Sequence, residues 1–258
     1  MNEESVINAN NVSTESNETN SLNEPNKIIE FSHVCKYYDY EGGTIKALED
    51  INFSINEGEL VIILGDSGAG KSTALNILGG MDKATKGEVI VNQEKISSMS
   101  EERLTNYRRN DIGFVFQFYN LVQNLTILEN VELATQITQN PFDPKEILEK
   151  VGLKDRMSNF PGQISGGEQQ RASIARAVCK NPKILLCDEP TGALDYKTGK
   201  VILSLLQEIN ERYHMTVIIV THNSVLKEIG DKIIRFKSGQ IENITINTNK
   251  KKVEDLEW

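Results

Sequence analysis

The sequence contains no apolar run that is long enough to cross a membrane. A membrane helix needs about 20 mostly apolar residues, whereas the longest apolar runs, "LVIIL" (60–64) and "VIIV" (217–220), have the length of strands. The N-terminus is acidic and lacks the basic and apolar regions of a signal peptide. These absences predict a cytoplasmic chain with no membrane span of its own.

Basic residues are in deficit and cysteines are few. The 258 residues include 28 Lys and Arg against 37 Asp and Glu, a formal net charge of -9. A general nucleic-acid binder needs clustered Lys and Arg, so nucleic acid is not an expected partner. The cysteines, Cys35, Cys179 and Cys187, are odd in number and lack metal-ligand spacing. We expect buried or neutral thiols in a reducing compartment.

The two ends of the chain have few large apolar residues. Residues 1–26 contain eight Asn and cannot bury enough surface to offset chain entropy, so we predict a disordered acidic tail. Residues 247–258 are predicted to form a second, C-terminal tail. Trp258 is expected to be a loose or locally packed aromatic in that tail, and a contact with a partner is the alternative.

Between the tails, at 27–246, strand and helix patterns alternate. Three apolar runs are typical of central parallel strands that are covered on both faces. They lie at 60–64, 183–187 and 216–220. Helical patterns lie at 72–80, 168–180 and 197–212. This alternation predicts an α/β domain with a mostly parallel core sheet.

Two further segments depart from this alternation. "INFSI" (51–55) alternates as a half-buried antiparallel strand does, and 232–244 is predicted to be a hairpin around Ser238-Gly239, so part of the β structure is antiparallel. The interval 126–165 is polar, helical in pattern and free of apolar strand runs, with Asp143 and Pro144 as helix-start residues. It predicts a small helical subdomain inserted into the core.

The stretch "GDSGAGKS" (65–72) fits the phosphate-loop pattern G-x-x-x-x-G-K-[ST] and stands between a buried strand and a helix. Its glycines let backbone N–H groups surround phosphate oxygens, and the helix N-terminus adds partial positive charge. Lys71 is expected to reach the β and γ phosphates of ATP, and the Ser72 hydroxyl to bind Mg²⁺. Asp66 is expected to point away from the phosphates. The residues predicted to contact the nucleotide here are Gly65, Ser67, Gly68, Ala69, Gly70, Lys71, Ser72 and Thr73.

An acidic pair follows the apolar strand of "KILLCDEP" (183–190). Asp188 at the strand end is placed to hold Mg²⁺ through water, and Glu189 is placed to polarise an attacking water. A solvated loop start is the alternative interpretation. The phosphate loop in the same chain favours the catalytic one.

A second glycine-rich helix start lies at Ser165-Gly166-Gly167. Ser165 is a natural N-cap, and capping alone is one interpretation. Two glycines at a helix start, however, cost stability unless something comes close to the backbone, and free N–H groups there suit an anion. With one phosphate loop per chain, the second anion site is predicted to hold the ATP of another copy, in a two-fold dimer that sandwiches two ATP molecules.

These motifs together resemble the ATP-binding cassette (ABC) ATPases. "ISGGEQQR" (164–171) resembles the family's signature motif LSGGQ, and the phosphate loop, "LLCDEP" and "TGALD" (191–195) occur in the family's order. The resemblance covers about residues 28 to 244. Within the family, "GFVFQFYNLVQNLTILENVEL" (113–133) and "DEPTGALD" are most similar to the LolD/MacB/FtsE type, which works with FtsX- or MacB-like permeases.

The resemblance implies further roles. Gln117 matches the glutamine that contacts Mg²⁺ and water and senses the γ-phosphate, and His222 matches the switch histidine at that phosphate. Asp195 matches an aspartate that crosses the dimer interface. Tyr38 fits the aromatic residue that stacks on adenine, with Tyr37 and Tyr40 as close alternatives.

The sequence departs from the family pattern at three points. Ile164 and Glu168 replace the usual Leu and Gln of the signature motif, and Glu168 places a negative charge near the expected ATP. The helical subdomain is also shorter than is usual for this type, which affects the surface expected to dock a permease.

The resemblance implies an ATPase subunit that dimerises on binding ATP and Mg²⁺ and drives a separate permease from the inner face of the membrane. The alternative is a regulatory ATPase without a transported substrate, which acts on a membrane partner to control a cell-wall hydrolase or to sense antimicrobial peptides. DNA-repair and translation ABC ATPases are disfavoured, because they carry coiled-coil insertions or two cassettes per chain.

Overall fold

A computed structural model describes residues 26–256, so the predicted N-terminal tail, apart from Asn26, and Trp258 lie outside the described residues. The larger sheet has the strand order β10-β9-β3-β8-β7-β6, in which all neighbours are parallel except β10 and β9. Its strands are β3 (Leu60–Leu64), β6 (Ile112–Val115), β7 (Ile184–Asp188), β8 (Thr216–Thr221), β9 (Lys232–Lys237) and β10 (Gln240–Ile246). The predicted mostly parallel core sheet is therefore confirmed.

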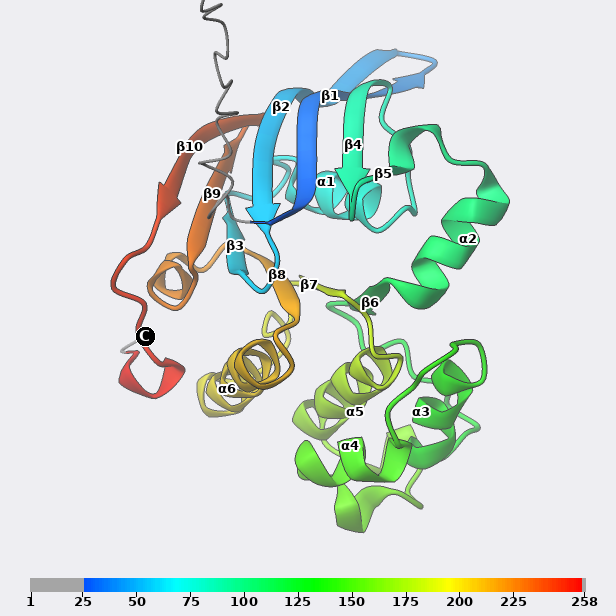
Figure 1. The fold of residues 1–258 in the computed structure, drawn as a ribbon. Coiled ribbons are helices and arrows are strands. Elements are labelled where there is room, and N and C mark those ends of the chain that lie inside the picture. Colours follow the sequence, from blue (N-terminus) through cyan, green and yellow to red (C-terminus); the bar gives the residue numbers. More distant parts are fainter. Residues whose placement is uncertain (1–25, 257–258) are drawn as a thin grey trace, which may run out of the picture.

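Alternate residues of the central strands belong to two different cores. In β3, Leu60, Ile62 and Leu64 face one core, whereas Val61 and Ile63 face the other. Side chains alternate along a strand, so an uninterrupted apolar run is what a strand covered on both faces requires. The sheet consequently separates two layers, which Figure 1 shows above and below it.

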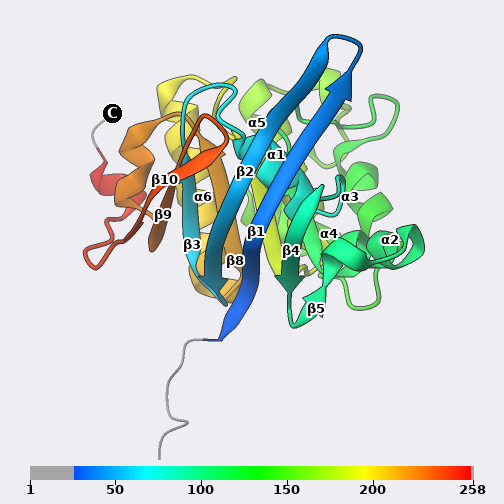
Figure 2. The same ribbon diagram turned by 90° about the horizontal axis from the view of Figure 1, so that it is seen from above.

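The upper layer consists of a smaller antiparallel sheet and two helices. The sheet has the order β2-β1-β4-β5 and lies across the top of the molecule (Figure 2). Its strands are β1 (Lys27–Tyr40), β2 (Gly43–Asn56), β4 (Lys86–Val91) and β5 (Glu94–Lys95). Helix α1 (Lys71–Leu78) lies between the two sheets, and α2 (Glu101–Asn110) packs on the same core. The strand predicted at 51–55 is the end of β2.

The lower layer contains the other helices, α3 (Ile127–Thr135), α4 (Pro144–Lys150), α5 (Gly166–Cys179) and α6 (Tyr196–Tyr213). Every residue from 126 to 165 is described, and none of them lies in a strand. Helix α3 begins with a capping box between Thr126 and Glu129. Helix α4 begins as its sequence indicates: the side chain of Asp143, just before Pro144, accepts from the backbone N–H groups of Lys145 and Glu146.

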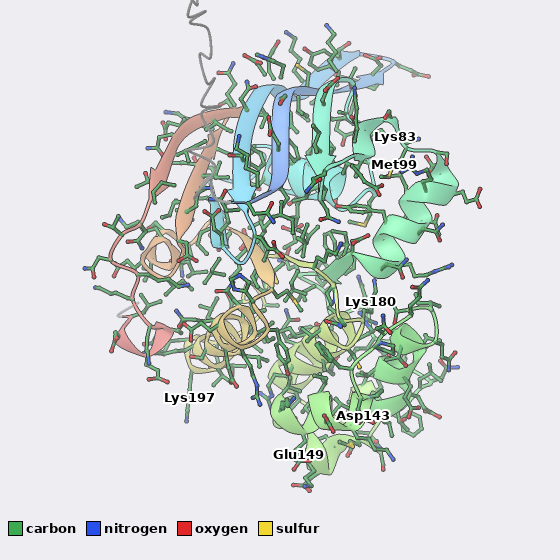
Figure 3. The ribbon with its side chains drawn as sticks, in the orientation of Figure 1. Lys83, Met99, Asp143, Glu149, Lys180 and Lys197 are labelled. Carbon is green, nitrogen blue, oxygen red and sulfur yellow. The ribbon has the colours of Figure 1, made fainter. Side chains whose placement is uncertain are left out.

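A lysine joins the two layers at the end of α5. The Nζ atom of Lys180 donates to the carbonyl oxygens of Arg108 and Ile112, both at 2.7 Å, and Figure 3 shows this side chain between α5 and the strand above it. Burial lowers the pKa of Lys180 to about 8. The α5 helix is thereby fixed to the junction of α2 and β6.

The described part of the predicted C-terminal tail, residues 247–256, packs against the lower layer. Val253 and Leu256 are buried in the lower core, around a short 3₁₀ helix at Val253–Asp255. The side chain of Gln207 in α6 accepts from Val253 N at 3.0 Å and donates to Lys251 O at 3.1 Å. Two apolar side chains and this amide were enough to dock a segment whose composition is polar.

Candidate nucleotide-binding site

The phosphate loop joins β3 to α1 and leaves its backbone N–H groups free of side-chain caps. Gly70 at the N-cap position has a φ of 99° and makes no side-chain cap hydrogen bond. A Cβ atom on Gly70 would lie 2.6 Å from the carbonyl oxygen of Ala47, so only glycine fits between the loop and β2. The turn of the β9–β10 hairpin supports the loop, because Gly239 N donates to Ala69 O at 3.1 Å.

Lys71 points back into this loop. Its side chain is buried, with the residue 7% exposed, and Nζ donates to the carbonyl oxygens of Gly65 at 2.8 Å and Asp66 at 2.9 Å. Among residues 26–256 no carboxylate lies within ion-pair distance of it. A buried ammonium group with only carbonyl partners suits an anionic ligand. Asp66 itself is exposed.

Asp188 and Ser72 meet at the carboxyl end of β7. The Ser72 hydroxyl donates to Asp188 Oδ1 at 3.1 Å. Burial raises the pKa of Asp188 and the charge of Glu189 raises it further, whereas the Ser72 hydrogen bond and Lys71 oppose this rise. A hydroxyl and a carboxylate in contact beside a phosphate loop are the oxygen ligands that Mg²⁺ prefers.

Glu189 is held in a constrained position next to His222. Its φ is 46°, in the left-handed region that non-glycine residues rarely adopt and that is concentrated at functional sites. Glu189 Oε1 lies 2.8 Å from His222 Nδ1, and Oε2 accepts from the Thr221 hydroxyl at 3.3 Å. The side chain of Glu189 is 16% exposed and that of His222 is 69% exposed. The structure thus brings together two residues that the sequence placed 33 positions apart.

Gln117 and Asp195 lie around the segment that follows Glu189. A Cβ atom on Gly192 would be 3.4 Å from both Gln117 Nε2 and Glu189 Cβ, so the amide of Gln117 reaches the Glu189 loop. Asp195 is exposed and caps α6, accepting from Thr198 N at 3.1 Å and from the Thr198 hydroxyl at 2.6 Å.

The three candidate tyrosines for adenine have different surroundings. Tyr38 is 40% exposed and donates to Asp82 Oδ2 at 2.6 Å, while Lys36 Nζ lies 4.7 Å from its ring centroid. Burial and the Asp82 carboxylate raise the pKa of Tyr38 to about 12, and a hydrogen bond with Thr73 of α1 opposes that rise. Tyr37 faces Glu49 instead, and the Tyr40 ring lies against Gly42 in the hairpin turn. Tyr38 is thus linked to the helix of the phosphate loop through Thr73.

The second glycine-rich helix start is a complete capping box. The Ser165 hydroxyl accepts from Glu168 N at 3.3 Å, and Glu168 Oε2 accepts from Ser165 N at 2.8 Å. Glu168 Oε1 also accepts from Arg156 Nε at 2.9 Å. The Ser165 backbone N–H and then Arg156 lower the pKa of Glu168 to about 2. The charge that Glu168 adds to the signature motif is therefore paired within the chain.

Two side chains of the same chain approach the glycine pair. A Cβ atom on Gly167 would lie 2.3 Å from Thr198 Cγ2 of α6, and one on Gly166 would lie 2.7 Å from the Tyr119 hydroxyl. Gly167 is buried, whereas Ser165 is exposed and Gly166 is partly exposed. Packing inside the chain therefore accounts for the glycine at 167, and the prediction of an external ligand rests on Ser165 and Gly166.

The two helix starts lie on opposite sides of the larger sheet. Helix α1 packs in the upper core and α5 in the lower core. Helix α1 follows β3, so it begins at the carboxyl ends of the parallel strands. Helix α5 precedes β7 and leads back to the amino end of that strand, so the start of α5 also lies at the carboxyl ends. One chain thus presents two separate glycine-rich helix starts at the same edge of one sheet.

Several contacts of the site have no signal in the sequence. Arg156 lies twelve residues before Glu168, outside any helical spacing rule. Asp82 reaches Tyr38 from the loop between α1 and β4, and Thr198 reaches Gly167 from a different helix. These partners depend on the tertiary fold, and the spacing of residues along the chain does not indicate them.

A parallel sheet with a lysine-bearing phosphate loop after one strand and an acidic pair after another defines a P-loop nucleotide-binding ATPase domain. The sequence model of the family described as ABC transporter matches residues 48–192. The chain therefore belongs to the ABC transporter family, as an ATP-binding cassette, and the resemblance drawn from its motifs is confirmed.

Relatives and solved structures agree with this assignment. An uncharacterized ABC transporter ATP-binding protein of Thermotoga maritima is 47% identical over 223 residues, which cover 84% of this chain and 95% of the relative. A putative ABC transporter ATP-binding protein of Mycoplasma pneumoniae is 42% identical over 90% of this chain, which spans 50% of that relative's length. The dimeric structure of the bacterial ABC transporter cassette MJ0796 has a TM-score of 0.78 and 44% identity, over 84% of this chain and 98% of the other.

A second solved structure shows MJ0796, a protein of Methanocaldococcus jannaschii, as a dimer in a post-hydrolysis state bound to ADP and Pi, with a TM-score of 0.77 and 43% identity over 84% of this chain and 98% of the other. Within residues 26–256, no helix is long and apolar enough to cross a membrane.

Proposed function

We propose that this chain binds and hydrolyses ATP with Mg²⁺ as the ATPase subunit of an ABC transporter. Two copies would close around two ATP molecules, and the cycle would power a separate FtsX/MacB-like permease at the cytoplasmic face of the membrane. The observation that supports the proposal most is the pair of glycine-rich helix starts, the two cradles, on opposite sides of one sheet, since a single nucleotide uses one of them.

The residues of the first cradle suit a magnesium nucleotide. Lys71 supplies a buried positive charge that has no carboxylate partner among residues 26–256, and the residues around it leave backbone N–H groups for phosphate oxygens. Ser72 and Asp188, already in contact, would hold Mg²⁺ together with Gln117. The ion would neutralise charge on the phosphate oxygens. Tyr38 would stack on the adenine ring.

Glu189 and His222 would carry out the proton transfer and the charge stabilisation of hydrolysis. The Glu189 carboxylate would accept the proton of the attacking water, and the strained backbone at this residue fixes its direction. His222, in contact with Glu189 and largely exposed, would reach the γ-phosphate. Lys71 would stabilise the charge of the transferring phosphoryl group.

The second cradle would complete the site of the other copy. Ser165 and Gly166 are the accessible members of the signature motif, and the α5 helix start adds partial positive charge. Asp195, exposed at the start of α6, would lie at the same interface. The dimeric MJ0796 structures support this arrangement, because this chain and MJ0796 share the cassette fold.

Trapping the closed dimer tests the shared site. Glu189→Gln keeps the shape of the side chain but removes the proton acceptor, so the variant should bind ATP, hydrolyse it slowly and accumulate as a dimer in sizing chromatography. Adding Gly166→Asp should abolish that dimer, because a carboxylate would meet the γ-phosphate, while the affinity of the monomer for ATP stays the same.

Gly166→Ala in the same background is the matched control. It meets the Tyr119 hydroxyl as Gly166→Asp does but carries no charge. The alanine variant should retain most of the ATP-induced dimer. Equal dimerisation by the aspartate variant would show that the helix start is a capping motif alone, and a loss of monomer affinity would show that it binds ATP within its own chain.

An exposed apolar surface near the phosphate sensor supports docking of a permease. Phe118 follows Gln117 directly and is 74% exposed, and Leu133 and Ile137 on and after α3 are exposed as well. Val122 is also exposed, on a loop that the Asn130 side chain holds against α3. Exposed apolar patches of this kind mark protein interaction sites.

Membrane recruitment tests the permease. The chain should sediment with membranes only when an FtsX/MacB-like permease is co-expressed. Leu133→Asp and Ile137→Asp should lose this recruitment and keep ATP turnover. Ile246→Asp, at an exposed position on β10, is the control and should be recruited normally. Recruitment without a permease, or unchanged recruitment of the α3 variants, would contradict the assignment.

A further inference from the structure

The carboxylate of Glu168 lies beside the hydroxyl that is proposed to meet the ATP of the other copy. Glu168 Oε2 accepts from Ser165 N and from the Ser165 hydroxyl, both at 2.8 Å. A phosphate oxygen bonded to that hydroxyl would be only one further hydrogen bond away from the carboxylate. Two negative charges this close repel each other, since physiological salt screens charges well only beyond about 8 Å.

The Ser165 hydroxyl carries one proton and can donate to one acceptor at a time. Within the single chain, Glu168 Oε2 takes that proton. If a phosphate takes it instead, the carboxylate loses this donor but keeps two others. Oε2 still accepts from Ser165 N, and Oε1 accepts from Arg156 Nε at 2.9 Å. The guanidinium of Arg156 therefore keeps the charge of Glu168 compensated when the hydroxyl turns away.

Arg156 is held in place by the backbone around it. Its N–H donates to the carbonyl oxygen of Leu153, a fully buried residue, at 3.0 Å. The next residue, Met157, accepts from Leu128 N of α3 at 3.0 Å. The Arg156 side chain is 50% exposed, and in the described part of the chain Glu168 is the only group that its guanidinium bonds. Replacing the side chain thus removes one contact and little packing.

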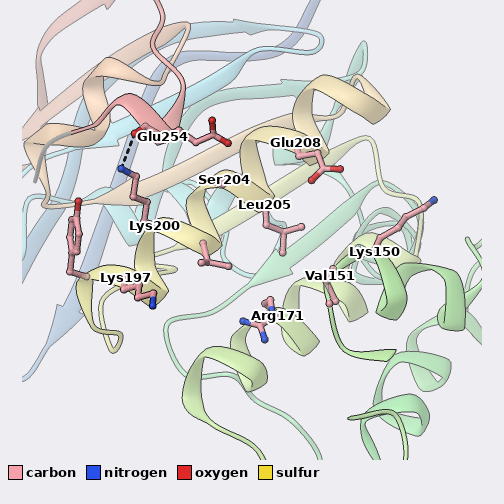
Figure 4. Close-up of a pocket in the computed structure, with 12 residues that line it drawn as sticks. Lys150, Val151, Arg171, Lys197, Lys200, Ser204, Leu205, Glu208 and Glu254 are labelled. Atoms are coloured by element: carbon pink, nitrogen blue, oxygen red, sulfur yellow. Dashed lines mark hydrogen bonds between the residues drawn. The ribbon is translucent and has the colours of Figure 1, made fainter. Parts of the chain in front are cut away.

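Arg171 is the cation that helical spacing alone would assign to Glu168, because it lies three residues further along α5. Instead, Arg171 lines an open groove between α6 and the α4–α5 pair, which Figure 4 shows. No ion pair joins Arg171 to Glu168 within residues 26–256. Arg156, from the segment before the signature motif, is the cation that pairs with this carboxylate.

We propose that Arg156 is a positioning residue of the shared ATP site. It compensates the charge of Glu168, so that Ser165 can turn its hydroxyl to the γ-phosphate of the other copy's ATP without repulsion from the carboxylate. This inference rests on the proposed function, because a dimer is needed to bring that phosphate to Ser165. The signature motif of this chain, with its glutamate, thereby depends on a cation outside the motif.

ATP-induced dimerisation in the Glu189→Gln background tests this role through a double-mutant cycle. In sizing chromatography over a range of ATP concentrations, Arg156→Ala should raise the concentration that gives half of the dimer several-fold. Adding Glu168→Gln should restore the parent's value, because the amide is neutral and its oxygen can still accept from Ser165 N. Glu168→Gln alone should dimerise at least as readily as the parent.

Two controls accompany the cycle. Arg103→Ala breaks another arginine–glutamate pair of 2.9 Å, on α2 in the upper layer, and should dimerise as the parent does. The affinity of the monomer for a fluorescent nucleotide should be the same in all variants, because Arg156 and Glu168 lie at the second cradle. The double variant carries the same alanine as Arg156→Ala, so a restored dimer also shows that this alanine is compatible with the fold.

Two results would overturn the inference and leave the proposed function intact. One is an Arg156→Ala variant that dimerises as readily as the Glu189→Gln parent. The other is a weakened dimer that Glu168→Gln does not restore, which would show that Arg156 acts on the fold or on the nucleotide and not through Glu168. A Glu189→Gln parent that forms no ATP-induced dimer would instead refute the proposed function, and this inference with it.

Discussion

Replacing Gly167 by alanine should destabilise the protein through one contact with Thr198. The new Cβ atom would lie 2.3 Å from Thr198 Cγ2, and the next atoms of that side chain are 3.6 Å or more away. Thr198→Ser removes this methyl group and keeps the hydroxyl that donates to Asp195 Oδ2. The pair of substitutions therefore separates a steric clash from every other effect of position 167.

The size of the effect follows from the packing at this position. An extra methyl group in a closely packed position costs about 1–3 kcal/mol, and the loss of one buried methyl in Thr198→Ser costs about 0.8 kcal/mol or less. In the serine background the clash is gone, and alanine is favoured over glycine in a helix by up to about 1 kcal/mol. Urea unfolding should therefore show Gly167→Ala as destabilising in wild type and neutral or stabilising with Thr198→Ser.

An equal loss of stability in both backgrounds would refute this account of Gly167. ATP-induced dimerisation in the Glu189→Gln background is a second measurement on the same variants. If position 167 serves packing, Gly167→Ala with Thr198→Ser should dimerise as the parent does. A stable double variant that fails to dimerise would assign the glycine to the partner's nucleotide.

Two other predictions concern Glu168 and Tyr38. The low pKa of Glu168 means that its stabilising contribution is fully present above the ordinary carboxyl pKa of 4.5 and is lost as the pH falls toward about 2. In urea unfolding, the difference between wild type and Glu168→Gln should thus be largest near neutral pH and shrink over that range; a constant difference would argue against the Arg156 and Ser165 contacts. Tyr38→Phe should retain ATP affinity in a fluorescent-nucleotide titration, because stacking needs the ring and not the Asp82 hydrogen bond, whereas Tyr38→Ala should weaken it; no loss in the alanine variant would exclude Tyr38 from the adenine site.

The sequence predicted the parts of the fold that local patterns determine. The apolar run at 60–64 forms the whole of β3. The predicted turn at Ser238-Gly239 joins β9 and β10, and its two residues have the positive φ values, 48° and 77°, that such a tight turn requires. The glycines and lysine of the phosphate loop act through backbone geometry close in the chain, so their spacing was sufficient to identify the motif.

Long-range contacts limited what could be predicted about the site. The glycine pair indicated a close approach to the backbone, but not that Thr198 and Tyr119 make it. The segment after residue 246 is mostly polar, so its composition did not predict that Val253 and Leu256 pack in the core. Two apolar residues in so short a segment form no recognisable pattern. Each of these contacts joins elements that are distant in sequence, where no periodicity relates the partners.

The central claim is that each ATP site is built from two chains, and mixing two inactive variants tests it most directly. Lys71→Ala lacks a working phosphate loop but keeps the signature helix start, and Gly166→Asp has the opposite defect. A heterodimer of the two contains one intact site. Because each heterodimer has one intact site of two, the mixture should recover Mg²⁺-dependent ATP hydrolysis up to about half of the wild-type rate, whereas each variant alone should be inactive. A mixture no more active than its separate components would contradict the shared-site account.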